Sequence, residues 1–254
     1  MFPLRDDNPT EILPIFTLGI IAACVAVWVL VQGAGMDQGM LAGSVCRLGT
    51  IPGELTGGAG ARGVELAPGL VCETGGLTWA TLVTSMFLHG SWMHLLGNMW
   101  FLWIFGNNVE DSMGHLRFLV FYLLTGLVAA GAHVISAADS PIPTVGASGA
   151  ISAIMGAYVV LYPRARVMTL VIVIFFIRFI PLPAWVMLGY WFVIQLASAG
   201  LTSPEGGGVA FWAHIGGFVA GVALIIPFRN PRLVNAKRAH VRLPRSQIEH
   251  GGWW

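Results

Sequence analysis

Serine and histidine residues that lie within apolar segments are the part of this sequence best able to do chemistry. Ser148 belongs to the tetrapeptide Gly146-Ala-Ser-Gly149, and His214 lies in the apolar run 208–227. A serine hydroxyl is a weak nucleophile until a neighbouring imidazole takes its proton. If the two segments pack together, they would supply a nucleophile and its base for attack on a carbonyl group.

A second polar pair precedes them in the chain. His94 and Asn98 are four residues apart, which places both side chains on one face of a helix that Ser91 is expected to cap. Attack on a carbonyl produces an oxyanion, which needs hydrogen-bond donors held in advance. We expect Asn98, His94 and the backbone N–H of Ser148 to be those donors.

An acidic partner for the histidine is not apparent. The acids of residues 79–228 are all expected in loops or at helix ends: Glu110, Asp111, Asp139 and Glu205. The predicted site is therefore a dyad of Ser148 and His214 and lacks the acid of a triad.

A metal site is not expected from the histidines. His89 and His94 are five residues apart, about 140° from a shared helical face. Acids and thiols that could complete a ligand set with His214 are not near them in the sequence. We therefore predict neither a metal nor a cofactor.

Composition places these residues in a membrane protein. The chain has 254 residues, of which 56% are hydrophobic and 10% are charged, against about 25% charged in soluble domains. So few charges cannot cover a globule in water, and most of the exterior must face lipid. A net charge of +1, without basic clusters interleaved with aromatic residues, argues against a nucleic-acid partner.

Six apolar segments are expected to cross the bilayer within a membrane domain of residues 15–228, giving an all-α membrane protein. They are 15–31, 92–107, 116–136, 147–162, 182–199 and 208–227. The run 168–180 is short for a span, carries Arg178 and is followed by Pro181. We therefore predict an interfacial or re-entrant segment within 163–181, on the cytoplasmic side.

Basic residues set the expected orientation, because Lys and Arg gather on the cytoplasmic side. With six spans and both ends inside, only Arg47 and Arg62 of the 13 Lys and Arg residues lie outside. Residues 1–14 and a flexible basic tail, 229–254, would then be cytoplasmic. The Gly-rich loop 33–77 would be outside, with no regular helix expected in it.

The cysteines leave one question open. Cys24, Cys46 and Cys72 are too few and too scattered for a disulfide framework. Cys46 and Cys72 could pair if their loop faces an oxidising compartment.

Taken in order, the polar motifs resemble the rhomboid family of intramembrane serine proteases, over about residues 79–228. The motifs are His89…His94…Asn98, Gly146-Ala147-Ser148-Gly149 and Ala213-His214-Ile215-Gly216-Gly217. The resemblance implies a six-transmembrane-helix rhomboid-like bundle, with Ser148 as nucleophile, His214 as base, and Asn98 with His94 around the oxyanion. It also implies supporting roles for His89, Gly146 and Gly149. The sequence carries Ser152 where some members have a tyrosine that packs on the histidine.

The function implied by the resemblance is a serine endopeptidase that cleaves transmembrane helices of membrane-protein substrates. Its partners would be those substrates and the lipid bilayer, and its expected location is the inner membrane of a bacterium. The sequence leaves the oligomeric state open.

Two other functions remain in view. An inactive rhomboid-like protein could bind substrate helices without cutting them, but such a protein would typically lack Ser148 or His214. A small transporter could use His94, Asn98, His133 and His214 as a polar pathway, which would predict buried acids and two related halves. His133 alone is better explained by a structural hydrogen bond.

Overall fold

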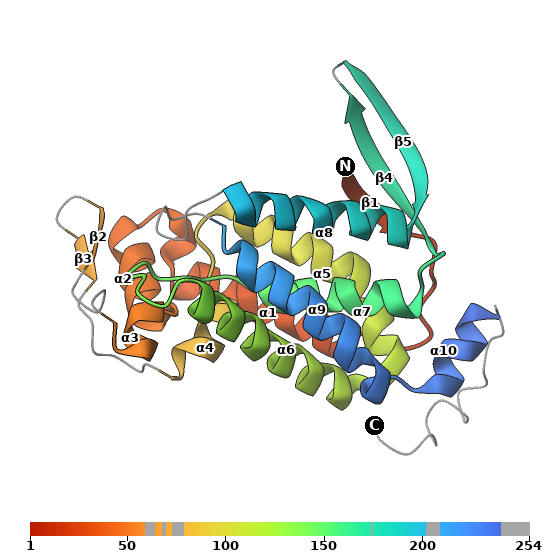
Figure 1. Cartoon of the computed structure of the whole chain (residues 1–254), viewed down its shortest axis with the longest axis horizontal. Coiled ribbons are helices and arrows are strands. Elements are labelled where there is room, and N and C mark those ends of the chain that lie inside the picture. The colour runs from red at the N-terminus through yellow and green to blue at the C-terminus, as the bar shows by residue number, and fades with distance from the viewer. Residues whose placement is uncertain (59–63, 68–69, 73–78, 174, 202–208, 240–254) are drawn as a thin grey trace.

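The structure, a computed structural model, describes residues 1–58, 64–67, 70–72, 79–173, 175–201 and 209–239. Its principal helices run roughly along one direction (Figure 1): α1 Ile15–Leu30, α5 Trp92–Met113, α6 His115–Ser136, α7 Ser148–Leu161, α8 Ala184–Leu201 and α9 Phe211–Phe228. Three of them, α6, α8 and α9, are long and apolar enough to cross a bilayer, whereas α1 and α7 are apolar but shorter. The chain is a mostly helical membrane protein, and the count of six spans stays a prediction.

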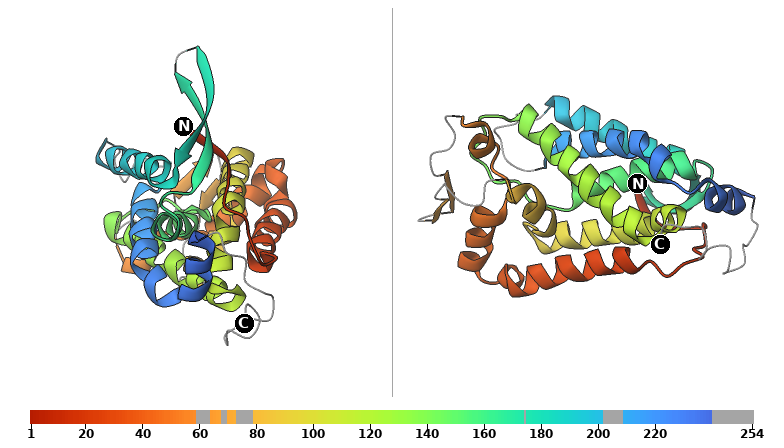
Figure 2. Two further views of the ribbon diagram at one scale, coloured as in Figure 1. Left: turned by 90° about the vertical axis from the view of Figure 1, so that its right-hand side faces the viewer. Right: turned by 90° about the horizontal axis from the view of Figure 1, so that it is seen from below.

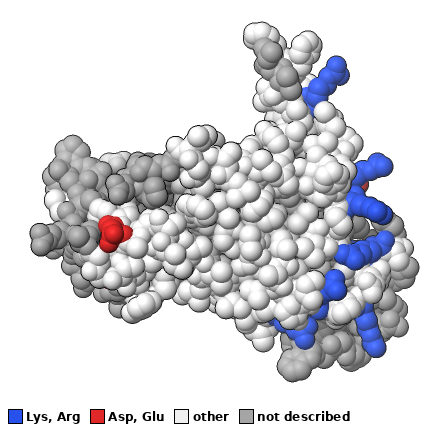
Figure 3. Space-filling view, viewed as in Figure 1, with Lys and Arg blue, Asp and Glu red and all other residues white. Residues whose placement is uncertain are grey.

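Shorter elements gather at the two ends of the bundle. They are β1 Phe2–Asp6, η1 Gly33–Gly35, α2 Gln38–Leu48, α3 Pro52–Thr56, β2 Val64–Ala67, β3 Leu70–Cys72, α4 Thr81–Thr84, η2 Ser85–Phe87, β4 Arg166–Val173, β5 Phe176–Pro183 and α10 Pro231–Arg238. We call the end with α2, α3, β2 and β3 the loop end. The end with β1, the β4–β5 hairpin and α10 is the basic end, since the Lys and Arg residues visible in Figure 3 gather there.

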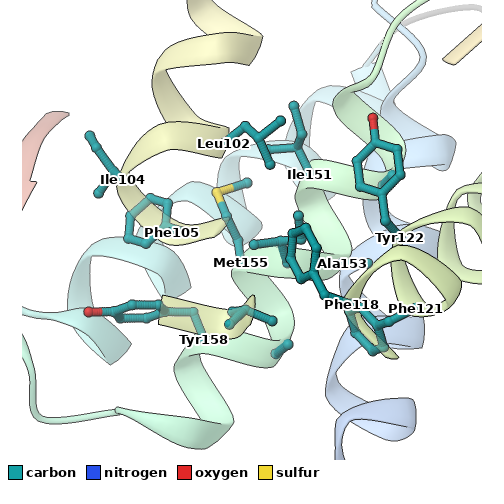
Figure 4. Packing of buried hydrophobic residues seen from close by; sticks show 14 of the residues in the cluster. Leu102, Ile104, Phe105, Phe118, Phe121, Tyr122, Ile151, Ala153, Met155 and Tyr158 are labelled. Atoms are coloured by element: carbon teal, nitrogen blue, oxygen red, sulfur yellow. The ribbon is translucent and has the colours of Figure 1, made fainter. Parts of the chain in front are cut away.

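The core is built around α7. Small residues such as Ala150, Ala153 and Ala157 are buried along it and let α5, α6 and α9 approach closely. Larger side chains fill the space between these helices (Figure 4), and Phe105 of α5 contacts Tyr158 of α7 edge to face with ring centres 5.0 Å apart. Burial on all sides is typical of a central helix, so the first residue of α7, Ser148, is held in a fixed place.

The loop end contains more helix than the sequence suggested. The prediction that no regular helix persists in 33–77 was wrong, because α2 and α3 form there. The Asp37 carboxylate accepts a hydrogen bond from the N–H of Met40 at 2.9 Å and caps α2. A disulfide joins Cys46 of α2 to Cys72 of β3, with Cα atoms 5.2 Å apart. These local contacts offset the low helix propensity of the glycines.

Two acids at the end of α5 organise the basic end. Glu110 is buried and accepts hydrogen bonds from the N–H groups of Phe16 and Thr17 at 3.0 and 2.8 Å, so it caps the start of α1. The Nδ1 atom of His115 lies 2.6 Å from the same carboxylate. Glu110 and Asp111 thus make their contacts with α1, His115 and Lys237 at the basic end of the bundle.

The beginning of the tail is also attached to this end. Lys237 donates hydrogen bonds to Asp111 at 2.7 Å and to Asn108 at 2.6 Å, and Arg238 donates one to the carbonyl of Leu161 at 2.7 Å. The predicted flexible tail was therefore wrong for α10, because these buried acceptors attract its basic side chains. Residues 240–254, with Arg242 and Arg245, lie outside the described residues, as does Arg62.

A three-stranded antiparallel sheet, in the order β1-β4-β5, was not predicted. Strand β1 pairs with β4, so that Pro3 lies opposite Thr169 and Asp6 opposite Val167. Asp6 also accepts hydrogen bonds from the Tyr158 hydroxyl at 2.6 Å and the Asn108 amide at 2.8 Å. The N-terminal strand is thereby tied to both the sheet and the helices.

Asp6 should make the stability of this attachment depend on pH. Burial raises the pKa of Asp6 from 3.8 to about 6, so its folded form holds a proton that the unfolded chain releases. Its contribution to stability is full below pH 3.8 and is lost as pH rises through about 6. We expect Asp6→Asn to stabilise the protein relative to wild type at pH 7.5, by at most about 3 kcal/mol, and to have little effect near pH 4. Unfolding in detergent at both pH values tests this, and an equal difference at both would contradict it.

Candidate active site

Ser148 and His214 are brought together by the packing of α7 against α9. The Oγ atom of Ser148 lies 2.8 Å from Nε2 of His214. Ser148 is the first residue of α7 and is half-buried, whereas His214, in the first turn of α9, is buried. A hydroxyl and an imidazole at this separation can exchange a proton directly.

Gln195 of α8 completes the surroundings of His214, and sequence reasoning missed it. Its Oε1 atom lies 2.8 Å from Nδ1 of His214, and its side chain is buried. An amide oxygen can only accept a hydrogen bond, so it favours the tautomer with the proton on Nδ1 and the lone pair on Nε2, facing Ser148. A lone amide inside an apolar span was the signal available in the sequence.

The histidine is supported by aromatic rings rather than by residue 152. The ring of Trp191, from α8, lies 5.8 Å from the ring of His214, and that of Phe211 lies 6.4 Å from it. Ser152 is too short to reach the ring and donates its hydroxyl to the carbonyl of Ser148 at 2.6 Å. Trp191 and Phe211 therefore pack against the His214 ring from two different helices, α8 and α9.

Glycine at position 146 allows His94 to approach Ser148. The backbone of Gly146 has φ +134°, a conformation that favours glycine, and its N–H donates to the carbonyl of Ser85 at 2.9 Å. A Cβ atom there would lie 2.8 Å from two ring atoms of His94 and 3.6 Å from the Ser148 Oγ. Gly149 is confined in a similar way, since a Cβ atom on it would lie 2.7 Å from the Cβ of Ala129 in α6.

Asn98 presents a free donor to the same space. The side chain is buried, and its Nδ2 atom has no hydrogen-bond partner among the described residues. Leaving a buried donor unpaired costs about 1–3 kcal/mol, so such a group points to a partner that arrives with a ligand. The arrangement suits a donor that waits for an oxyanion.

These side chains line one cavity of about 870 Å³, which is large enough for an extended peptide segment. Its walls come from α5, α6, α7, α8 and α9 and include Met93, His94, Asn98, His133, Ser148, Trp191 and His214. His133 donates to or accepts from the Thr144 hydroxyl at 2.8 Å, the structural hydrogen bond expected for it.

His89 supports the candidate site through its contact with His94. Its ring packs edge to face on that of His94, with centres 5.1 Å apart. Gln32, at the end of α1, accepts from the His89 N–H at 2.8 Å and donates to its carbonyl at 2.7 Å, which fixes the backbone before α5. Burial, with a smaller effect from His94, lowers the pKa of His89 to about 3, so the ring is neutral. The Ser91 hydroxyl then caps α5 by accepting from the N–H of His94 at 3.1 Å, as predicted.

Glycines in α9 set the distance between the two reactive side chains. A Cβ atom on Gly217 would overlap the carbonyl of Gly149, next to Ser148, and one on Gly221 would overlap the backbone of Ala153. The backbones of α7 and α9 are therefore in direct contact, as small residues four apart allow.

Gly217→Ala should push α9 away from α7 and weaken the contact between Ser148 and His214. We expect a loss of about 1–3 kcal/mol of stability from overpacking, together with a lower rate of serine labelling by a fluorophosphonate. Gly131→Ala in α6 is the matched control, because a Cβ atom there meets nothing within 4 Å. Equal behaviour of the two variants in thermal unfolding would show that the helices are not in close contact.

Comparison with known proteins adds an independent observation. The family model described as Rhomboid domain matches residues 76–231. The chain is 36% identical to Rhomboid protease GluP of Bacillus subtilis (strain 168) over 155 residues, which cover 59% of this chain and 27% of that protein. It is 31% identical to Rhomboid-like protease 5 of Toxoplasma gondii over 181 residues, which cover 68% of this chain and 19% of that one. It is also 41% identical to Rhomboid-like protein 11, chloroplastic, of Arabidopsis thaliana over 75 residues, 29% of this chain and 26% of that protein. The matched region thus spans about a quarter or less of these relatives.

Proposed function

The chain belongs to the rhomboid family, and we propose that it is an intramembrane serine endopeptidase that cleaves transmembrane helices of other membrane proteins. The observation that carries the proposal is the 2.8 Å contact between Ser148 Oγ and His214 Nε2 at the edge of a cavity large enough for peptide. Gln195, on the other side of the imidazole, favours the tautomer that can accept the serine proton.

In the first half of the proposed reaction, Ser148 Oγ attacks the carbonyl carbon of the scissile peptide bond while His214 Nε2 takes the hydroxyl proton. The carbonyl oxygen becomes an oxyanion, to which the Asn98 Nδ2 and the N–H of Ser148 donate, with His94 beside them. The first N–H groups of a helix have no partner within it, so the start of α7 suits this role. Return of the proton from His214 to the leaving amine breaks the C–N bond and leaves an acyl-enzyme.

In the second half, water replaces the leaving peptide. His214 takes a proton from the water as its oxygen attacks the ester carbonyl, and gives that proton to Ser148 Oγ as the ester bond breaks. The products are a peptide with a new carboxylate, a peptide with a new amine, and the original serine.

The substrate must expose its peptide bond before it can react. Helical hydrogen bonds hide the backbone of a transmembrane segment, so local unwinding is needed, and helix-breaking or small residues would ease it. Ser148 starts α7 on the side of the loop end, which would give water a route from that end. With the orientation predicted from the basic residues, the reaction faces the non-cytoplasmic side and both termini are cytoplasmic, in the inner membrane of a bacterium.

The test is cleavage of a reporter by the full chain in lipid vesicles. A single-span reporter with Gly and Ala near one end of its span should be cut into two fragments, and mass spectrometry should place the cut within the span. A fluorophosphonate should label wild type on Ser148. A chain that binds the reporter without cutting it, and that the probe does not label, would instead be an inactive binding protein.

Gln195 should act as a positioning residue in this reaction. Gln195→Leu removes the acceptor on Nδ1, so the imidazole loses its preferred tautomer, and we expect kcat to fall by about 10–100-fold with little change in KM. Gln195→Glu keeps an acceptor and should restore most of the rate. A purely structural role would predict parallel losses in both variants and in the melting temperature.

A further inference from the structure

The β4–β5 hairpin exposes more apolar surface than a protein in water can support. Its exposed side chains include Ile172 (60% exposed), Phe175 (92%), Phe176 (70%), Ile177 (61%) and Phe179 (63%). Soluble proteins rarely leave such a contiguous patch uncovered, and an apolar edge strand in water promotes aggregation. Something apolar must therefore cover this hairpin.

Both faces of the hairpin are apolar. The register pairs Ile172 with Ile177 and Leu170 with Phe179 on one face, and Val171 with Arg178 on the other. Arg178 is the only charged residue between residues 167 and 183. A strand that faced water on one side would alternate apolar and polar residues, and these strands do not.

The hairpin projects sideways from the bundle at its basic end. Figures 1 and 2 show it pointing away from the helices, across their common direction. Backbone hydrogen bonds fix its base. The N–H of Ala184 donates to the carbonyl of Ala165 at 2.8 Å, and the N–H of Trp185 donates to the carbonyl of Pro163 at 3.1 Å. The N–H of Asp7 donates to the carbonyl of Arg166 at 2.9 Å. Strand β5 ends at Pro183 and α8 begins at the next residue, so the hairpin leaves the bundle where α8 enters the membrane.

We propose that the β4–β5 hairpin is a lipid anchor that lies in the headgroup and acyl-chain boundary of the leaflet at the basic end. A structure that extends sideways from a bundle at this depth meets lipid, and apolar rings on both faces suit that boundary. Trp185, 58% exposed at the start of α8, has the position of an interfacial tryptophan.

Charge favours an anionic leaflet as the surface that the hairpin meets. Arg164 and Arg166 are exposed at its base, and Arg178 is exposed on β5, with a stem that can follow the apolar surface to the headgroups. Basic side chains close to an anionic lipid surface are attracted to it. The anchor would hold the site, at the other end of α7 and α9, at a fixed depth in the bilayer.

The test measures the depth of spin labels on the full chain in vesicles. Phe176→Cys and Ile177→Cys place a nitroxide on opposite faces of β5, and Asn235→Cys on α10 is the control exposed to water. Cys24 is buried and Cys46 and Cys72 are joined, so wild type gives the labelling background. Vesicles are made of phosphatidylcholine, with or without phosphatidylglycerol.

At both hairpin positions we expect several-fold greater relaxation by dioxygen, which dissolves in lipid, than by a water-soluble nickel chelate. The reverse is expected at Asn235→Cys. Replacing Arg164, Arg166 and Arg178 together with Gln should abolish any additional depth that phosphatidylglycerol gives, and Arg178→Gln alone should reduce it. Nickel accessibility equal to that of the control would overturn the proposal. Labels shielded from both reagents, with broadening between molecules, would also overturn it, in favour of a second copy of the chain. The readout does not depend on proteolysis, so it is independent of the proposed function.

Discussion

Ser148→Ala is expected to abolish cleavage of a transmembrane reporter, with kcat falling by about 10⁴–10⁶-fold. The hydroxyl 2.8 Å from His214 is the nucleophile that attacks the peptide bond in our proposed mechanism, and alanine leaves nothing to form the acyl-enzyme. His214→Ala should cost about as much, because an unassisted serine hydroxyl is a poor nucleophile. The measurement is initial rate in vesicles at saturating reporter.

The double variant separates a shared role from two independent ones. If Ser148 and His214 act as one unit, the variant that lacks both should be no slower than either single variant. Ser112→Ala is the matched control, since this buried serine lies at the basic end and its hydroxyl donates to the carbonyl of Val109 at 2.6 Å, within its own helix. Cleavage that survives Ser148→Ala would end the protease proposal.

Asn98→Ala should lower kcat by about 10²–10³-fold, which is the usual cost of losing one oxyanion donor, with KM nearly unchanged. The melting temperature of the Asn98→Ala variant should rise or stay the same. The Nδ2 atom is buried without a partner among the described residues, so removing it relieves a desolvation cost. Rates and melting temperatures measured on the same preparations test both parts.

Asn98→Leu provides the companion variant, because leucine has the same branching and number of side-chain heavy atoms as asparagine, leaves no cavity and has no donor. Equal losses of rate in the alanine and leucine variants would assign the effect to the missing N–H rather than to a cavity. If Asn98→Ala instead lowers the melting temperature together with the rate of cleavage, the loss of rate comes from a less stable fold. Asn98 is then a packing residue, and other groups must bind the oxyanion.

Much of the bundle could be predicted from the sequence. The predicted spans 15–31, 116–136 and 208–227 coincide with α1, α6 and α9 to within three residues at each end. Apolar runs of this length have few alternatives to a buried helix, because in lipid the backbone must satisfy its own hydrogen bonds. The second predicted span was too short, since α5 continues past residue 107 to Met113, and Glu110 and Asp111 near its end are paired rather than exposed.

The elements at the basic end could not be predicted in the same way. The hairpin 166–183 has an apolar sequence that fits a helix or a strand, and the choice depends on β1, which pairs with β4 from the other end of the chain. The attachment of α10 depends on Asp111 and Asn108 of α5. Contacts between residues so far apart in sequence leave no periodicity to detect.

Some features of the candidate active site could be predicted from the sequence, and others could not. Residue type and order alone pointed to Ser148, His214 and Asn98, because hydroxyl, imidazole and amide groups inside apolar segments are costly and need a purpose. The sequence could not show that Gln195 faces Nδ1 of His214, or that Gly146 leaves room for His94, since both depend on how separate helices pack. Local composition determined which groups are available and that they are buried in a membrane. Only tertiary packing decided which of them are within hydrogen-bonding distance, because that distance depends on backbone contacts such as the one between Gly217 and Gly149.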